Sequence, residues 1–238
     1  MIIMPYYDSG DLINFITKDF YNTSWKTKLN KLGDIARGLI QIHELNVVHR
    51  DFHSGNIFFH NVNQYFTSIP FVNSVTIGDL GISKSATESG DDNNNENYGI
   101  IPYMAPEVFQ GQKYTKASDI YSFGMIMWEF MTGRRPFWDR NHDAELIIEI
   151  CDENPPKFVK KNPTKIIESS DIGPVTKNNP GAIYRSRPLS AMINSAMSLR
   201  SSRSQSINLE EVKRKFKDDL IEDNDDDGMI YKKLQVKY

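Results

Sequence analysis

The stretch from Thr115 to Gly133 is apolar nearly all round, and it constrains the fold more than any other part of the sequence. Surface helices keep one polar face, so a helix that is apolar on every side has to be enclosed by other elements. A second helix is predicted from Trp25 to about Leu45, where apolar residues recur at three- and four-residue steps after Ser24, a suitable N-cap. The chain is therefore expected to fold around a central helix.

Shorter elements complete the expected fold. A further helix is predicted over 143–151, and two short β-type runs at 57–60 and 74–78 predict a small hairpin. Strands and helices that follow one another in this way indicate an α+β fold, mainly α-helical.

Composition divides the chain near residue 155. Apolar periodicity is strong over 1–155, whereas Ser, Lys, Asn, Asp and Pro dominate 156–238. Polar segments of this kind cannot bury enough apolar surface to fold, so we expect one folded region followed by a largely disordered, Ser/Lys/Asp-rich tail. A short amphipathic helix over 208–221 is predicted to interrupt that tail.

Bulk properties exclude several classes of function. The formal net charge of −3 provides no basic field of the kind that binds nucleic acid or anionic lipid. Cys151 is the only cysteine, which excludes an internal disulfide and a multi-cysteine zinc site. No segment reaches the ~18 apolar residues of a membrane span. We expect an intracellular, cytoplasmic protein with neither nucleic acid nor membrane as a partner.

Four short motifs follow one another along the chain: HRDFHSGN at 49–56, GDLG at 78–81, APE at 105–107 and SDIYSFG at 118–124. In this order and spacing they resemble the C-terminal lobe of eukaryotic protein kinases, and the wording of the last looks most like the tyrosine-kinase-like group. Each motif alone could be an ordinary turn; their order makes the signal specific. The resemblance covers about residues 1–151.

The resemblance implies a role for each matching residue. Asp51 would orient the substrate hydroxyl and accept its proton, while Asn56 and Asp79 would hold Mg²⁺ against the phosphates of ATP. Asp119, at the start of the central helix, would accept backbone N–H bonds and brace the catalytic loop. His49 is expected to pack under the metal-binding turn rather than to act as an acid or base.

The first residues resemble the hinge between the two lobes of a kinase. Adenine would bond to the carbonyl group of Pro5 and the N–H of Tyr7, with Asp11 near the ribose; only the carbonyl of the proline is used, so its missing N–H costs nothing there. A plain strand-turn-helix is the alternative interpretation of the same residues.

Two departures from the family pattern concern the acceptor of the phosphoryl group. Ser/Thr kinases usually carry Lys where this chain has His53 and Thr where it has Ile100. The surrounding motifs still favour a Ser/Thr hydroxyl as the acceptor, and a Tyr hydroxyl is left open (EC 2.7.11 or 2.7.10).

Two arginines are candidates for charged contacts. Arg50 is a candidate to bind a phosphate on the polar segment 82–104. Arg187 is the candidate ion-pair partner of Glu107.

No Gly-rich loop and no Val-Ala-Ile-Lys strand precede the hinge in this sequence. We therefore expect a fragmentary chain that is weak or inactive by itself as an ATP-dependent protein kinase, in contact with ATP and a protein substrate. The main alternative is a pseudokinase-like lobe that docks a partner through the helices at 117–151. A metal-dependent phosphohydrolase using Asp51, His53 and Asp79 is a third interpretation.

Overall fold

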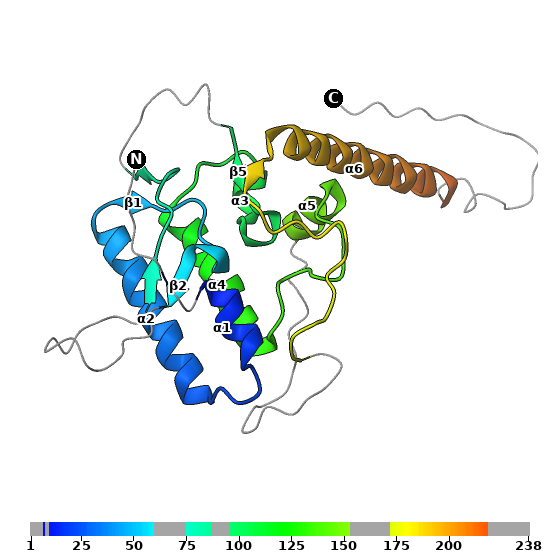
Figure 1. Cartoon of the computed structure of the whole chain (residues 1–238). Helices are drawn as coiled ribbons and strands as arrows, with labels where there is room; N and C mark the ends of the chain where they lie inside the picture. The colour runs from blue at the N-terminus through cyan, green and yellow to red at the C-terminus, as the bar shows by residue number, and fades with distance from the viewer. Residues whose placement is uncertain (1–6, 8–9, 60–74, 87–95, 153–171, 219–238) are drawn as a thin grey trace, which may run out of the picture. The chain divides into compact units, whose positions relative to one another are not determined.

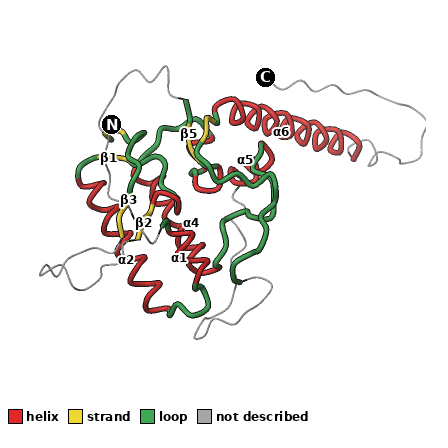
Figure 2. Tube along the Cα trace, viewed as in Figure 1, coloured by secondary structure: helices red, strands yellow, loops and turns green. Residues whose placement is uncertain are grey.

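The computed structural model describes residues 7, 10–59, 75–86, 96–152 and 172–218, with side chains described as far as 204. Its helices are α1 (Leu12–Lys18), α2 (Trp25–Glu44), α3 (Pro106–Phe109), α4 (Lys116–Thr132), α5 (Ala144–Cys151) and α6 (Ser190–Asp218). Its strands are β1 (Val47–Val48), β2 (Ile57–Phe59), β3 (Val75–Ile77), β4 (Lys84–Ser85), β5 (Tyr98–Gly99) and β6 (Arg187–Pro188). Figures 1 and 2 show these mixed helices and small sheets, which confirm an α+β composition.

Helix α4 is the predicted central helix, and its sequence fixes both of its ends. At its start the Thr115 side chain accepts the N–H of Ser118 while the Ser118 hydroxyl accepts the N–H of Thr115, a reciprocal capping box. At its end Gly133 adopts φ 73°, the left-handed conformation in which glycine is favoured. Ile126 and Phe130 in between are completely buried.

Helix α2 and the hairpin agree with their predictions. The Ser24 hydroxyl accepts the N–H of Thr27 and caps α2 as expected. Strands β2 and β3 pair antiparallel, with Ile57 opposite Ile77, and β3 packs closely on α2. A Cβ atom on Gly38 would lie 2.9 Å from Ile77 Cδ1, so the absence of a side chain there permits this close packing.

Two further antiparallel pairs of strands connect loops and do not form a wide sheet. Strand β1 pairs with β4, and β5 pairs with β6 with Tyr98 opposite Pro188 and Gly99 opposite Arg187. Each of the paired sheets in the described residues has two strands. The core therefore consists mainly of side chains between helices.

The expectation of a disordered tail from residue 156 is wrong for 172–197. These residues belong to a compact unit that runs to Met197, and a second unit, 198–238, begins within α6. Leu189, Ile193 and Ala196 are at most 4% exposed in the core of the first unit. Their spacing of four and three residues forms one apolar helix face, which the polar composition around them concealed. Residues 153–171 and 219–238 lie outside the described part of the chain.

Helix α6 also differs from the short helix predicted over 208–221. It begins at Ser190 and continues to Asp218, so the predicted segment coincides with its last turns, and 219–221 lie outside the described residues. None of the helices that the structure describes combines the length and the apolar character needed to cross a membrane.

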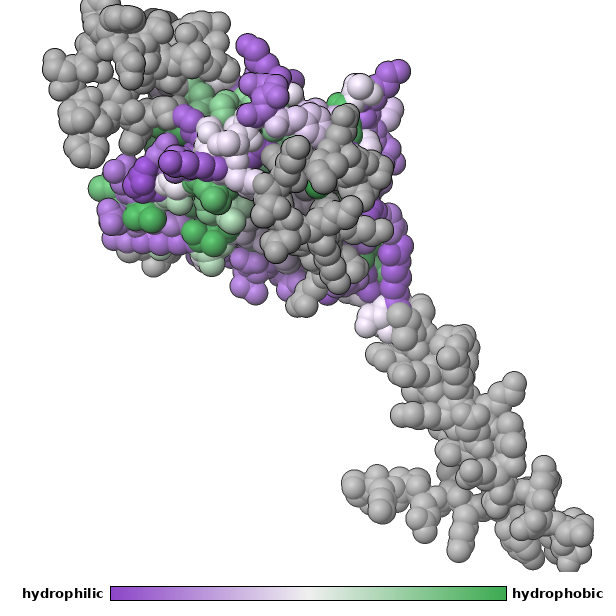
Figure 3. All heavy atoms as spheres, turned by 90° about the horizontal axis from the view of Figure 1, so that it is seen from below, coloured by the Kyte–Doolittle hydropathy of each residue, from purple (hydrophilic) through white to green (hydrophobic). Residues whose placement is uncertain are grey.

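Apolar side chains are also found on the surface. Figure 3 shows them in small groups among polar side chains on one face. On and just after α2, Leu29, Ile40 and Leu45 are 61%, 53% and 78% exposed. Helix α2 therefore buries one face, with Leu32, Ile35 and Leu39, and presents a partly apolar face to solvent.

Candidate functional site

The loop at 49–56 runs from β1 to β2, and Asp119 at the start of α4 holds its first residues. The Asp119 carboxylate accepts the backbone N–H of His49 at 2.8 Å and that of Arg50 at 3.0 Å. Arg50 has φ 72°, a left-handed conformation that is uncommon for a residue with a side chain. The two hydrogen bonds stabilise this turn, and the predicted brace is confirmed.

Two histidines, His43 and His49, lie beside the Asp119 brace. His43 Nε2 lies 2.8 Å from Asp119 Oδ2. His49 is completely buried, and its Nε2 lies 3.1 Å from the carbonyl oxygen of Gly78. Burial lowers the pKa of His49 although Asp119 nearby opposes the shift, which favours a neutral ring. The geometry agrees with the expected packing role of His49.

Asp51 lies in the middle of the loop and is 7% exposed. The hydroxyl of Ser186 donates a hydrogen bond to Asp51 Oδ2, and His53 Nε2 lies 3.6 Å from the same oxygen. Burial by itself would raise the pKa of the Asp51 carboxyl, but His53 and the Ser186 hydroxyl outweigh it, so the pKa lies below its ordinary value. Asp51 is therefore an ionised carboxylate that already accepts a bond from a hydroxyl.

His53 is oriented by the chain that follows it. The Gly55 N–H donates to His53 Nδ1 at 3.0 Å, which leaves Nε2 as the nitrogen that carries the proton and faces Asp51. A Cβ atom on Gly55 would lie 2.9 Å from the ring, so glycine permits this turn. Sequence reasoning treated His53 as a replacement for lysine and, in the phosphohydrolase interpretation, grouped it with Asp51 and Asp79. The structure places it beside the Asp51 carboxylate.

Asn56 and Asp79 lie at the same end of the hairpin. The Gly78 N–H donates to the carbonyl oxygen of Asn56 at 2.8 Å, which joins the end of the loop to the residue before Asp79. The Asn56 side-chain nitrogen donates to the carbonyl oxygen of Asp51 at 2.9 Å. The amide oxygen of Asn56 is the side-chain atom that could then bind a metal ion. Asp79 is exposed and has φ 57°.

These two side chains fit the donor set that Mg²⁺ takes in phosphate-handling sites, one or two carboxylate or amide oxygens completed by phosphate and water. The phosphohydrolase interpretation needs more protein ligands. Among the described residues no three His, Cys, Asp or Glu side chains form a group that could hold a metal ion. The structure therefore does not bring Asp51, His53 and Asp79 together as that interpretation requires.

The residues predicted to bind nucleotide are only partly described. Pro5 lies outside the described residues. The ring of Tyr7 stacks on Phe58 with centroids 5.3 Å apart. Asp11 caps α1, accepting the N–H of Asn14 at 2.9 Å, and bridges to Phe58 on β2. Tyr7 and Asp11 thus both lie against β2, the strand that follows the loop at 49–56.

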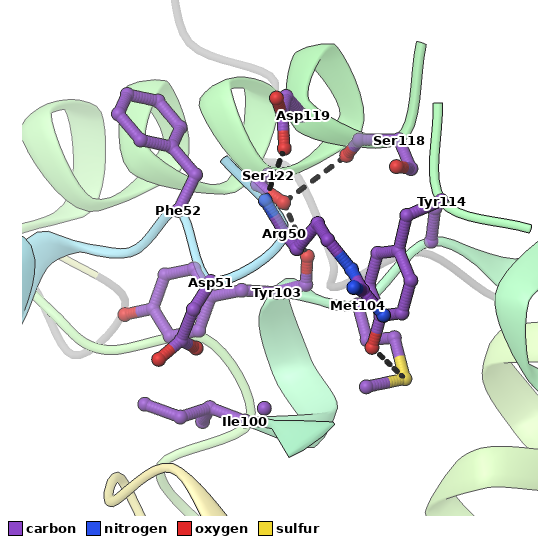
Figure 4. A pocket seen from close by; sticks show the side chains of 12 residues that line it. Arg50, Asp51, Phe52, Ile100, Tyr103, Met104, Tyr114, Ser118, Asp119 and Ser122 are labelled. Atoms are coloured by element: carbon purple, nitrogen blue, oxygen red, sulfur yellow. Dashed lines mark hydrogen bonds between the residues drawn. The ribbon is translucent and has the colours of Figure 1, made fainter. Parts of the chain in front are cut away.

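A pocket beside the loop is shown in Figure 4. The Arg50 guanidinium lies 4.7 Å from the centre of the Tyr114 ring, and its buried Nε has no hydrogen-bond partner. The residues that could carry a phosphate for it include 87–95, which lie outside the described part of the chain. Arg187 donates to the carbonyl oxygen of His142 at 2.8 Å, and within the described residues no ion pair joins it to Glu107.

A buried carboxyl group under the loop, that of Glu129, was not predicted from the sequence. Tyr103 donates to Glu129 Oε1 at 2.5 Å, and the Ser54 hydroxyl donates to the same oxygen at 3.1 Å. Burial raises the pKa of Glu129 to about 8, although both hydrogen bonds oppose the shift. The one available signal was an acidic residue within the apolar stretch at the end of α4. Ser186 gave no signal, because it lies in the segment expected to be disordered.

Comparison with known proteins identifies relatives of the chain. A family described as "Protein tyrosine and serine/threonine kinase" matches residues 1–169. The chain is 31% identical to serine/threonine/tyrosine-protein kinase HT1 of Arabidopsis thaliana over 65% of this chain and 37% of that protein. It is 33% identical to serine/threonine-protein kinase VIK of the same plant over 69% and 36%. It is 31% identical to ephrin type-A receptor 3 of Danio rerio over 64% and 15%. The chain thus matches well under half the length of these relatives.

Proposed function

Because the chain belongs to the protein tyrosine and serine/threonine kinase family, we propose that it carries the catalytic loop of a protein kinase of the tyrosine-kinase-like group. The reaction is transfer of a phosphoryl group from ATP to a Ser or Thr hydroxyl of a protein, with Tyr as the less favoured acceptor. The main support is the ionised Asp51 carboxylate, which is held by the braced loop and accepts a bond from a hydroxyl.

In this proposal Asp51 acts on the acceptor. Its carboxylate aligns the hydroxyl for attack and takes the proton as the new P–O bond forms, while ADP leaves with the electrons of the broken bond. Because the transition state is loose, positioning contributes more than the strength of the base. The Asp119 brace therefore contributes by keeping the loop in one conformation.

The proposed cofactors are ATP and Mg²⁺. Asn56 and Asp79 would hold the metal ion, and Pro5, Tyr7 and Asp11 would contact the adenosine part. When bound, Mg²⁺ offsets the negative charge on the phosphoryl oxygens. His53 lies where its Nε2 can donate to Asp51 and help to orient that carboxylate.

Replacement of the base tests the proposal. Asp51→Asn is expected to lower phosphoryl transfer from Mg·ATP to a serine-containing protein by about 10² or more, because an amide cannot take the proton. The melting temperature should change little. Asp139→Asn, which alters an exposed carboxylate outside the loop, is the matched control. Transfer at the wild-type rate by Asp51→Asn would remove Asp51 from this role.

A second candidate function, docking of a protein partner through the helices at 117–151, is supported by the surface of α4. Ile120, Met127 and Met131 are 53%, 40% and 38% exposed and lie on one face of this helix, seven and four residues apart. Ile120→Lys combined with Met127→Lys should abolish such docking without affecting Asp51, so co-purification and phosphoryl transfer separate the two functions.

A further inference from the structure

The segment 185–188 lies against the catalytic loop, and its last two residues form a strand. Strand β6 (Arg187–Pro188) pairs antiparallel with β5 (Tyr98–Gly99), as Figure 1 shows beside α3. Strand β5 itself passes close to Asp51, because a Cβ atom on Gly99 would lie 3.8 Å from Asp51 Oδ1. A strand added to β5 is therefore brought directly to the carboxylate.

Ser186, the residue before β6, makes the contact. Its hydroxyl donates to Asp51 Oδ2 and lies 3.5 Å from His53 Nε2. A phosphoacceptor hydroxyl would have to make the same donation to Asp51 before losing its proton. Serine places its hydroxyl close to the backbone, whereas a tyrosine hydroxyl lies a ring's length farther away and would not fit from a strand at this spacing.

The contact does not depend on the Ser186 hydrogen bond alone. On one side, the Tyr184 hydroxyl donates to the carbonyl oxygen of Pro136 at 2.8 Å. On the other, the Leu189 N–H donates to the carbonyl oxygen of Asn97 at 2.7 Å, and the Leu189 side chain is 1% exposed. Two anchors that flank a short segment give it a high effective concentration at the site between them.

We propose that residues 185–188 occupy the acceptor site in cis, with the Ser186 hydroxyl in the position of the substrate hydroxyl. The inference rests on the proposed function, since only a kinase has an acceptor site at Asp51. A protein substrate then reaches Asp51 only after this strand has left β5. Ser186 and the β5 edge thus form an autoinhibitory contact whose occupant is a segment of the same chain.

The occupancy can be measured without phosphoryl transfer, by labelling carboxyl groups of the full chain with a water-soluble carbodiimide and glycine ethyl ester. Asp79, which is exposed, is the internal reference, and each site is quantified by peptide mass spectrometry. Asp51 can be labelled only in molecules from which the strand has left. If the strand is docked in about nine molecules of ten, the labelling of Asp51 should be about tenfold slower than without the strand. Labelling of Asp51 in the wild type as fast as that of Asp79 overturns the proposal.

Two variants of Ser186 test whether its hydroxyl is responsible for the protection of Asp51. Ser186→Glu places a second carboxylate against Asp51, so the strand is expected to leave and the labelling of Asp51 to rise about tenfold. Ser186→Thr keeps the hydroxyl and should keep the protection. Unchanged protection in a folded Ser186→Glu chain contradicts the proposal. Hydrogen exchange at the Leu189 amide reports docking in the wild type even if a variant unfolds, and exchange at an unprotected rate also contradicts it.

The labelling result and the kinase function fail separately. If Asp51 is protected in the wild type and released in Ser186→Glu as expected, while Mg·ATP supports no phosphoryl transfer by Ser186→Glu either, the contact exists and the proposed function is wrong. The interpretation of the contact as an occupied acceptor site is then overturned. If transfer occurs, Ser186→Glu should lower the KM for a protein substrate several-fold. Transfer with an unchanged KM would overturn the inference alone.

Discussion

At the scale of single residues, the site depends on places where a side chain is absent or unusual. Gly55 permits the turn that directs His53 toward Asp51, and Arg50 adopts a left-handed conformation that Asp119 stabilises. The sequence indicated the identities of Asp51 and Asn56 but not the partners of Asp51. His53 and Ser186 reach the carboxylate through tertiary contacts that local spacing does not encode.

Gly133 provides a sharp test at this scale. Its φ is 73°, and a Cβ atom there would lie 2.8, 2.9 and 3.0 Å from ring atoms of the buried Phe20. Gly133→Ala is expected to destabilise the protein by about 2–4 kcal/mol, from the left-handed backbone and overpacking together. Urea denaturation measures the loss.

Gly33 is the matched control, because it lies within α2 and a Cβ atom would meet nothing within 4 Å. Gly33→Ala should stabilise the chain by about 0.5–1 kcal/mol, since alanine loses less backbone entropy in a helix. Equal effects of the two substitutions would contradict the conformation assigned to Gly133.

At the scale of elements, the first turn of α4 and the loop at 49–56 act as one unit. Asp119→Ala leaves the N–H groups of His49 and Arg50 without their acceptor, and each unmade buried bond costs about 1–3 kcal/mol. We expect a loss of about 3 kcal/mol in thermal or chemical unfolding. Asp119→Asn retains one acceptor oxygen and should lose less. A wild-type midpoint for Asp119→Ala would show that the loop is held by other contacts.

Glu129, farther along α4, should make stability depend on pH. Burial raises its pKa to about 8 in the folded protein, above the ordinary value of 4.5, so folding favours the protonated form. Its contribution is complete below pH 4.5, decreases as the pH rises and is lost above about 8. The free energy of unfolding, measured by urea denaturation, should therefore fall between pH 5 and 9 by an amount on the order of a few kcal/mol.

Glu129→Gln is the control for this titration. The amide keeps an oxygen for the bonds from Tyr103 and Ser54 but cannot ionise, so the fall with pH should largely disappear. A decrease of the same size in the variant would assign the pH dependence to another group.

At the scale of the whole molecule, regular elements were predictable and long-range pairings were not. The apolar run over 115–133, the Ser24 cap and the hairpin depend on local periodicity, and the structure has a helix, a cap and two paired strands at these places. The helix is enclosed less completely than expected, because Ile120, Met127 and Met131 are exposed. The packing of 172–197 was not predicted, because its apolar residues are sparse and contact partners far away in the sequence. Composition averages over such residues and therefore indicated disorder.

The start of α6 tests this correction. Ile193 is 4% exposed in the core of the first unit, whereas Leu199, on the same helix, is 43% exposed. Ile193→Ala is expected to lower the free energy of unfolding by about 2–5 kcal/mol, through lost burial and the cavity left behind. Leu199→Ala should change it by about 0.5 kcal/mol or less. If 172–197 were disordered, neither substitution would alter the urea midpoint, so the difference between the two variants decides whether this segment belongs to the core.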